Sequence, residues 1–163
     1  MTGVNGPVAV RPATADDIGG CVDIIRALPE FFTPDVPETV RADLSRHRGW
    51  VVTMGSQVLG FVVVALRSDA AAEIRWMAVA ADSRGVGHGT TLIDHVLGEL
   101  EEEGVSVVEV KTLDHSASDP TYEPTRAFWE HRGFVQIDTI DPLPGWQPGN
   151  PSAIYVAALK PTR

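Results

Sequence analysis

Apolar residues along this chain follow two spacings, one typical of strands and one typical of helices. Runs rich in β-branched and aromatic residues, which favour strands, cover residues 8–14, 50–66, 73–79, 105–113, 134–140 and 153–160. Apolar residues at helical spacing cover residues 15–28, 38–47, 87–103 and 124–132. The longest β-rich run is interrupted by Gly55 and Ser56, which predicts a hairpin. We therefore expect a protein of the α/β (α+β) class.

The order of elements in the middle of the chain predicts a pair of parallel strands. The helix over residues 87–103 ends before Gly104, and glycine commonly follows a helix end. Its last turn is rich in glutamate, including Glu99, and we expect these carboxylates to be solvated. A strand, a helix and a second strand in this order form a right-handed crossover between parallel strands. Residues 73–79 are therefore expected to pair with residues 105–113.

Length and composition fit a single globular domain over residues 1–163, since a hydrophobic core of this size rarely splits. Hydrophobic residues make up 44% and charged residues 21%, which are ordinary values for such a domain. The formal charge is −9, with 22 acidic and 13 basic residues. Without a basic cluster to contact phosphates, nucleic acid is not an expected partner. The negative charge favours a cationic partner.

Cysteine usage and hydropathy indicate the cytoplasm. Cys21, the single cysteine, cannot form an internal disulfide, and its place on the apolar face of the first helix predicts a buried, inert thiol. The first ten residues lack the pattern of a signal peptide. No apolar run approaches the roughly 20 residues that span a bilayer, so no membrane association is expected. The five histidines show no metal-ligand spacing, and no metal is expected.

Glycines at alternate positions join the strand over residues 73–79 to the helix that follows it. Gly85, Gly87 and Gly89 make this turn. A glycine-rich turn before a helix is an anion site, because the first N–H groups of the helix have no intrahelical partner. A dinucleotide fingerprint would need glycine at position 90, which is Thr90, and a P-loop would need a Gly-Lys-Ser/Thr ending. We expect the turn to bind a phosphate group by another arrangement.

Three motifs in order resemble the GNAT superfamily of acyl-CoA N-acyltransferases. Residues 84–89, RGVGHG, fit its Q/R-x-x-G-x-G/A signature, and residues 125–134, TRAFWEHRGF, resemble its second motif. The preceding run AEIRWMAV is similar to the central strand of the family, and the resemblance extends over residues 8–160. It implies the GNAT fold, a mixed central sheet of about six to seven strands flanked by about four helices, with splayed central parallel strands.

The resemblance implies that the glycine turn binds the pyrophosphate of coenzyme A, and that acetyl-CoA is the cosubstrate. Backbone groups of the central strand would bind pantetheine, and one N–H group would polarise the thioester carbonyl. The cofactor-binding residues expected on this basis are Met77, Val79, Arg84, Gly85, Val86, Gly87, His88, Gly89, Thr90 and Trp129.

Glu73 is the candidate general base, because its position resembles that of the base glutamate of the histone acetyltransferase branch. An amine acceptor, with a pKa of about 10, must lose a proton before it attacks a thioester. In the structural alternative, Glu73 is an exposed carboxylate at the strand end, paired with Arg75. Trp129 stands where many family members have a tyrosine as general acid, and an indole cannot supply that proton. Tyr122, also expected as a packing residue, is the candidate replacement.

The expected activity is transfer of an acetyl group from acetyl-CoA to a primary amine of a small molecule or peptide, by direct attack. Five aromatic residues exceed the needs of a small core, and some of them are expected to line the acceptor pocket: Phe31, Phe32, Trp50, Trp76 and Trp146. The protein is expected to be a monomer or a homodimer. A non-catalytic acyl-CoA-binding module is the alternative, and a nicotinamide-binding reductase is a more distant one.

Overall fold

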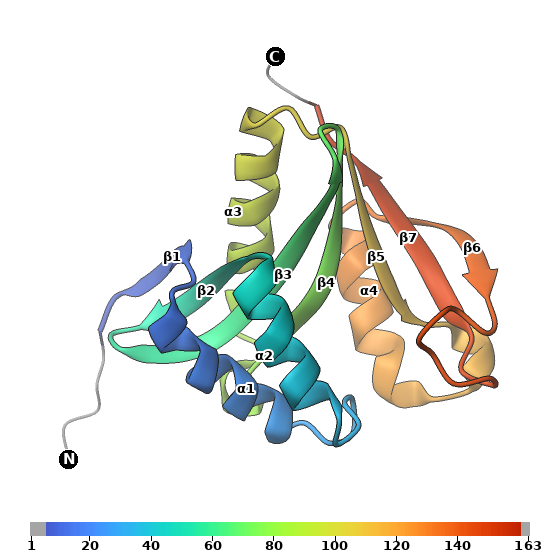
Figure 1. Ribbon diagram of the computed structural model, residues 1–163, viewed down its shortest axis with the longest axis horizontal. Coiled ribbons are helices and arrows are strands. Elements are labelled where there is room, and N and C mark those ends of the chain that lie inside the picture. The colour runs from blue at the N-terminus through green and yellow to red at the C-terminus, as the bar shows by residue number, and fades with distance from the viewer. Residues whose placement is uncertain (1–5, 161–163) are drawn as a thin grey trace. The chain divides into compact units, whose positions relative to one another are not determined.

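The protein, described by a computed structural model over residues 6–160, consists of two compact units (Figure 1). The first comprises Met1–Ala65 and Arg75–Leu100, and the second comprises Leu66–Ile74 and Glu101–Arg163. Residues 1–5, part of the opening stretch judged above for a signal peptide, and residues 161–163 lie outside the described residues. The single domain expected over residues 1–163 stays a prediction.

Seven strands form a mixed sheet in the order β1-β2-β3-β4-β5-β7-β6. Their bounds are β1 Val8–Pro12, β2 Arg48–Met54, β3 Gln57–Ser68, β4 Ala71–Val79, β5 Val107–Leu113, β6 Val135–Ile140 and β7 Ser152–Ala158. The pair β4 and β5 is parallel through residues 71–74 and 107–110, as predicted. The remaining residues of β4 belong to the first unit. The last strand, β7, lies between β5 and β6 and is antiparallel to both.

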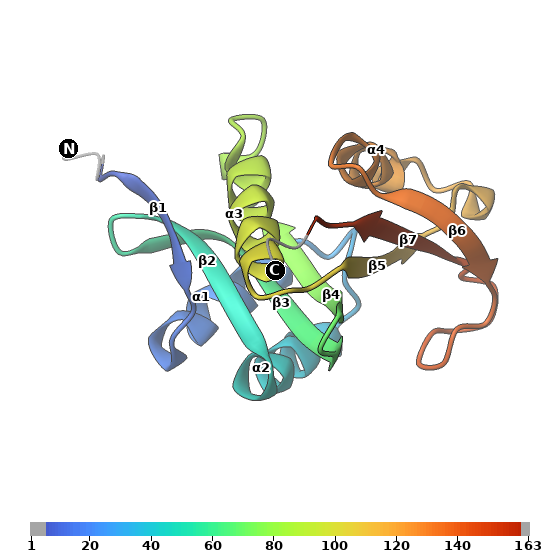
Figure 2. The same ribbon diagram turned by 90° about the horizontal axis from the view of Figure 1, so that it is seen from above.

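In the first unit, helices cover both faces of the strands. Figures 1 and 2 show α1 (Ile18–Arg26) and α2 (Val36–Arg46) together on one face and α3 (His88–Glu102) on the other. Strand alternation explains the two layers, because neighbouring residues point to opposite faces. Val51 and Phe61 pack under α1 and α2, whereas Trp50 is directed toward α3.

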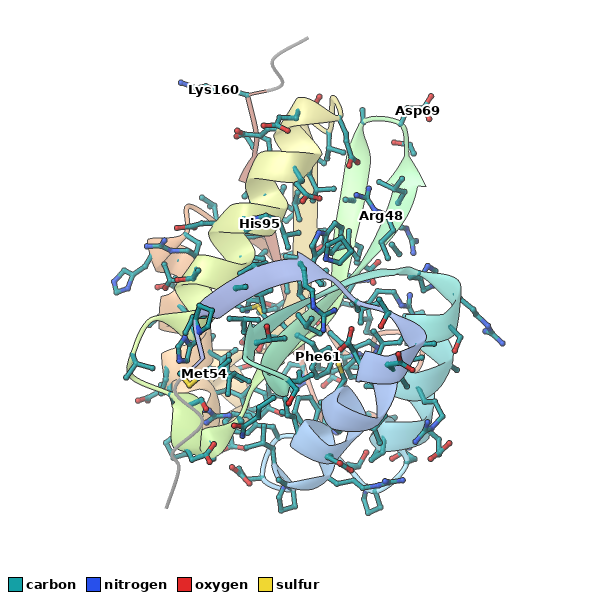
Figure 3. The ribbon with its side chains drawn as sticks, turned by 90° about the vertical axis from the view of Figure 1, so that its left-hand side faces the viewer. Arg48, Met54, Phe61, Asp69, His95 and Lys160 are labelled. Atoms are coloured by element: carbon teal, nitrogen blue, oxygen red, sulfur yellow. The ribbon has the colours of Figure 1, made fainter. Side chains whose placement is uncertain are left out.

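Glu99 of α3, whose side chain is 34% exposed, is the centre of a polar cluster that the sequence did not predict. Its Oε2 accepts a hydrogen bond from Trp50 Nε1 at 3.1 Å, and its Oε1 lies 2.8 Å from His95 Nε2. Arg48 lies 3.8 Å from the same carboxylate and stacks over the Trp50 ring. Figure 3 labels Arg48 of β2 and His95 of α3. The buried indole needs an acceptor for its N–H group, and Glu99 supplies it. This contact ties α3 to β2.

In the second unit, α4 (Glu123–His131) covers one face of β5, β7 and β6 (Figure 2). Tyr155 of β7 is 1% exposed and donates a hydrogen bond from its hydroxyl to Glu130 of α4 at 3.0 Å. Burial first, and then this hydrogen bond, raise the pKa of Tyr155 to about 12. Val110 pairs with Tyr155 and shares its face, so Glu109 and Lys111 lie on the opposite face of β5.

A buried carboxylate fixes the end of β5 to β6. Asp114 is 2% exposed and accepts hydrogen bonds from the Ser116 hydroxyl at 2.6 Å, Gln136 at 2.7 Å and Thr139 at 3.2 Å. Burial acts to raise the pKa of Asp114, but these hydrogen bonds outweigh burial and lower the pKa well below its usual range. Asp114 is therefore ionised at neutral pH and holds three segments together.

Candidate active site

The glycine turn after β4 has an unusual backbone at two of its three glycines. Gly85 has a φ of 79° and Gly87 a φ of 85°, which is the left-handed region that favours glycine. A Cβ atom built on either residue would meet no other atom within 4 Å. The backbone angles therefore require glycine here, and the space above the turn is open. Gly89 lies in the first turn of α3.

The first turn of α3 has backbone N–H groups that come before the first hydrogen bond within the helix. The first bond of the ladder runs from the Thr91 N–H to the Gly87 carbonyl at 2.9 Å, and the Thr91 hydroxyl donates to the same oxygen. The N–H groups of His88, Gly89 and Thr90 precede that bond and have no partner within the helix. With the dipole of a 15-residue helix behind them, they can bind an anion such as a phosphate.

Arg84, at the start of the turn, contacts two other elements of the first unit. Its Nε donates to the carbonyl of Val79, the last residue of β4, at 3.3 Å. Its guanidinium carbon lies 5.0 Å from the centre of the Phe31 ring, within the range of a cation–π contact. Val86, two residues further along the turn, has an exposed side chain, which makes one side of the turn apolar. These contacts attach the turn to β4 and to the segment between α1 and α2.

Aromatic residues gather beside the carboxyl-terminal half of β4. The rings of Phe31 and Phe32 are 6.3 Å apart, and Phe32 meets Trp76 edge-on at 6.3 Å. Trp76 Nε1 donates to Asp43 of α2 at 2.7 Å, and Arg75 Nε donates to the same oxygen at 2.9 Å. Nothing in the sequence pattern indicated Asp43, which lies far from β4 along the chain.

The remaining two aromatic candidates lie elsewhere. Trp50 is 1% exposed in the core of the first unit, and its indole N–H group donates to Glu99 of α3. Trp146 belongs to the segment between β6 and β7 in the second unit. Of the five aromatic residues expected near an acceptor, three contact one another, and these are Phe31, Phe32 and Trp76.

Glu73 lies in a cluster of charges built by three strands of the second unit. Its Oε2 is 3.3 Å from Arg67 of β3 and 3.3 Å from Lys111 of β5. Lys111 also lies 3.0 Å from Glu109. Glu73 is 7% exposed, so the expectation of an exposed carboxylate at the strand end is wrong. The residue expected as its partner, Arg75, donates to Asp43.

The two candidates for the proton donor differ in their surroundings. Tyr122 ends the short helix η4 (Pro120–Tyr122), and burial raises its pKa above the ordinary value for tyrosine. Trp129 of α4 is 4% exposed and packs edge-on against Phe128 and Phe134, with ring centres 5.0 and 5.1 Å apart. Trp129 is therefore part of the hydrophobic core of the second unit.

Residues 6–160 were also searched for a reactive cysteine, a metal site and a membrane-spanning helix. Cys21 is fully buried, as predicted, and burial raises the pKa of its thiol to about 12, so it is not a nucleophile. Among residues 6–160, no group of three or more His, Cys, Asp or Glu side chains could hold a metal ion. Within the same range, no helix is long and apolar enough to cross a membrane.

The mixed seven-stranded sheet, with a glycine turn between β4 and α3, defines the GNAT fold. Residues 45–136 match the family model of the GNAT acetyltransferase domain, and the chain belongs to this family. No curated protein matches the chain by sequence.

Solved structures share the fold over most of their length. A protein from Desulfovibrio desulfuricans assigned to the GNAT family superposes with a TM-score of 0.81 at 19% identity, covering 93% of this chain and 99% of its own. The ribosomal-protein-S18-alanine N-acetyltransferase of Escherichia coli gives 0.75 at 17%, covering 93% and 94%. A GNAT acetyltransferase from Elizabethkingia anophelis, solved with acetyl-CoA bound, gives 0.71 at 16%, covering 93% and 98%. Identities this low establish the fold alone.

Proposed function

We propose that this protein is an N-acetyltransferase that moves the acetyl group of acetyl-CoA to a primary amine by direct attack. The observation that carries the proposal is the open glycine turn at the start of α3, in a chain of the GNAT family. A phosphate needs close approach to backbone N–H groups, and this turn offers that approach without side chains in the way.

Coenzyme A would be bound mainly by main-chain groups of the first unit. The N–H groups of residues 87–90 would bind the pyrophosphate, with Arg84 and Val86 at the edge of the turn. The backbone of Met77 and Val79 would bind the pantetheine amides as an added strand would. Main-chain recognition of this kind tolerates variation in side chains, which is consistent with structural similarity at 16–19% identity.

Glu73 is the proposed general base. The acceptor amine must lose a proton, and a carboxylate can take it directly or through one water molecule. Because Glu73 is 7% exposed and already contacts Arg67 and Lys111, a relay through water is the better fit. The amine nitrogen then forms the bond to the acetyl carbon, the carbon–sulfur bond breaks, and coenzyme A leaves as a thiolate.

The departing thiolate needs little help from a general acid. A thiol has a pKa of about 8.5, so the leaving group is only weakly basic near neutral pH. Tyr122 is the proposed donor if one is used, because a tyrosine with an ordinary pKa of about 10 already carries its proton at neutral pH and burial raises the pKa of Tyr122 further. Trp129 would contact coenzyme A without donating a proton, because an indole cannot supply one.

The acceptor proposed here is a small-molecule or peptide amine, and a cationic one fits the formal charge of −9. Phe31, Phe32 and Trp76 form the aromatic surface best suited to contact it in the first unit. A cytoplasmic protein with one domain over residues 1–163, either a monomer or a homodimer, completes the proposal.

Two measurements on the purified protein separate this function from its alternatives. Coenzyme A, but not NAD, should raise the melting temperature, since a ligand that binds only the folded state stabilises it. A panel of amines should then release free thiol from acetyl-CoA. Stabilisation by coenzyme A without thiol release from any amine would identify a binding module, and stabilisation by NAD alone would identify a nicotinamide-binding protein.

A further inference from the structure

A buried carboxylate of α2 holds two side chains of β4, both within the first unit. Asp43 is 5% exposed, and its Oδ2 accepts a hydrogen bond from Trp76 Nε1 at 2.7 Å and another from Arg75 Nε at 2.9 Å. Hydrogen bonds to a carboxylate are stronger and shorter than those between neutral groups. The contact from α2 therefore fixes the direction in which the indole ring of Trp76 lies.

The fixed ring of Trp76 offers carbon atoms, rather than its N–H group, to a ligand. An indole has one hydrogen-bond donor, and in Trp76 this donor is bound to Asp43. The ring meets Phe32 edge-on, with ring centres 6.3 Å apart. Both rings are half-buried against the core under α1 and α2. The surface that Phe32 and Trp76 leave uncovered is therefore apolar.

The carboxylates of α2 already have partners. Asp43 accepts its two hydrogen bonds, and Glu38 lies 3.4 Å from Arg26 and 3.7 Å from Arg41. An aliphatic polyamine needs several acceptors along its length, because each ammonium group that leaves water must be paired. An amine with one aromatic group gains instead from edge-to-face or offset contact with other rings. The surface formed by Phe32 and Trp76 therefore fits an aromatic amine better than a polyamine.

We propose that Asp43 is a positioning residue that holds the Trp76 ring against Phe32, so that the two rings form a ready contact surface for an acceptor with an aromatic group near its primary amine. The inference rests on the proposed function, because it names the class of amine that the same enzyme acetylates. Asp43 has no contact with the acceptor itself, and its effect on the acceptor passes through the indole ring of Trp76.

Removal of the carboxylate should weaken acceptor binding more than turnover. Asp43→Leu, which keeps a branched side chain and removes both acceptor oxygens, should raise the KM for 2-phenylethylamine about five- to tenfold, the usual worth of one aromatic contact. The Kd for acetyl-CoA should match that of the wild type, and kcat should change less than KM. Asp43→Asn, the milder variant, should shift KM in the same direction and serves if Asp43→Leu does not fold. Glu38→Gln removes one charge from an exposed site of the same helix and should leave KM unchanged.

The matched test is a double-mutant cycle with Trp76→Phe, which keeps a ring and removes the indole N–H group. If Asp43 acts through that group, Asp43→Asn should raise the KM of Trp76→Phe by less than about twofold. Asp43→Asn should also have little effect on the KM for 1,4-diaminobutane, which has no ring to place. Equal rises in KM for both amines, or in both backgrounds, would overturn the proposal, as would a wild-type protein with a higher kcat/KM for the diamine.

A second readout does not depend on turnover. In ¹⁵N-labelled protein, the indole N–H signal of Trp76 is the one that Trp76→Phe lacks, and it should exchange with solvent more slowly in the wild type than in the Asp43 variants. Addition of 2-phenylethylamine should shift this signal in the wild type. A signal that exchanges equally fast in all proteins, or that the amine does not shift, sinks the role of Asp43. If both NMR results hold but no protein releases thiol, the aromatic surface binds the amine and it is the proposed acetyltransfer that fails.

Discussion

The glycine turn of the first unit and the charged cluster of the second unit are organised in opposite ways. In the turn, Gly85 and Gly87 adopt left-handed backbone angles with open space above them, and the chemistry belongs to main-chain N–H groups. Around Glu73 the chemistry belongs to side chains from three strands, which hold one another by ion pairs at 3.0–3.3 Å.

This difference separates two tasks. A site made from backbone can bind a phosphate regardless of most side chains, because every residue except proline supplies an N–H group. A proton acceptor depends on its own charge and on every charge near it. Substitutions in the turn should therefore remove binding, whereas substitutions in the cluster should remove turnover and leave binding intact.

The largest effect is expected from Gly87→Val. A branched side chain is strained at a φ of 85° and fills the open space above the turn, so coenzyme A binding should be undetectable. Calorimetric titration measures this in a variant first shown to be folded. Gly98→Ala is the matched control, because Gly98 lies within α3 with open space around it and should keep wild-type affinity. Wild-type affinity in folded Gly87→Val would remove the phosphate-binding role of the turn.

The complementary variant is Glu73→Gln, which keeps the shape of the side chain and removes its charge. We expect kcat to fall roughly 10²- to 10⁴-fold near neutral pH, the usual cost of losing a general base, with an unchanged Kd for acetyl-CoA. The loss should shrink at high pH, where more of the amine is already neutral. Glu102→Gln, at the exposed end of α3, should leave kcat unchanged. More than half of the wild-type turnover at pH 7 in Glu73→Gln would assign the base elsewhere.

A substitution at Asp114 tests whether this buried carboxylate, which accepts hydrogen bonds from uncharged donors, stabilises the fold. Asp114→Asn should lower the free energy of unfolding by about 2 kcal/mol at pH 7, because it leaves the donors of Ser116, Gln136 and Thr139 competing for a neutral acceptor. Since the folded-state pKa of Asp114 lies below its unfolded value of about 3.9, its contribution is complete above that pH.

The difference between wild type and Asp114→Asn should therefore be constant above about pH 5 and shrink as the pH falls below about 4. Urea unfolding followed across this range measures it. A difference that grows on acidification would contradict the assignment of Asp114 as an ionised, hydrogen-bonded carboxylate. Unlike Glu73→Gln, this variant should keep the wild-type pH profile of kcat.

The smallest effect is expected from Tyr122→Phe, which deletes one hydroxyl group and little volume. Because a thiolate is a weakly basic leaving group, kcat should stay within about tenfold of wild type. Trp129→Phe, which keeps an aromatic residue in the core of the second unit, should behave in the same way. Steady-state kinetics against pH with one good acceptor measures both. A fall well beyond tenfold in Tyr122→Phe would make Tyr122 the general acid.

The features that the sequence predicted correctly are those set by neighbouring residues. The parallel pairing of β4 and β5 followed from a strand, a helix and a strand in succession, and the turn followed from the spacing of Gly85 and Gly87. The position of β7 between β5 and β6 could not be foreseen, because strand order depends on packing across the whole sheet.

The partners of Glu73 on other strands were missed for the same physical reason. The sequence suggested only Arg75, the nearest cation along the strand, whereas the register places Glu109 opposite Glu73 and brings Lys111 and Arg67 to it from other strands. Asp43 and Glu99 were missed as acceptors because the indole groups they bind, Trp76 and Trp50, are distant in sequence. Side-chain networks depend on register, which local patterns do not encode.

The most direct test of the account is a paired measurement of thiol release and acetylated product with acetyl-CoA and a panel of primary amines. The account predicts that at least one amine yields thiol and acetylated amine in equal amounts. It also predicts that Gly87→Val and Glu73→Gln each abolish or sharply reduce both products. Free thiol with no acetylated amine, or equal yields of both products from the wild type and from the two variants, would contradict it.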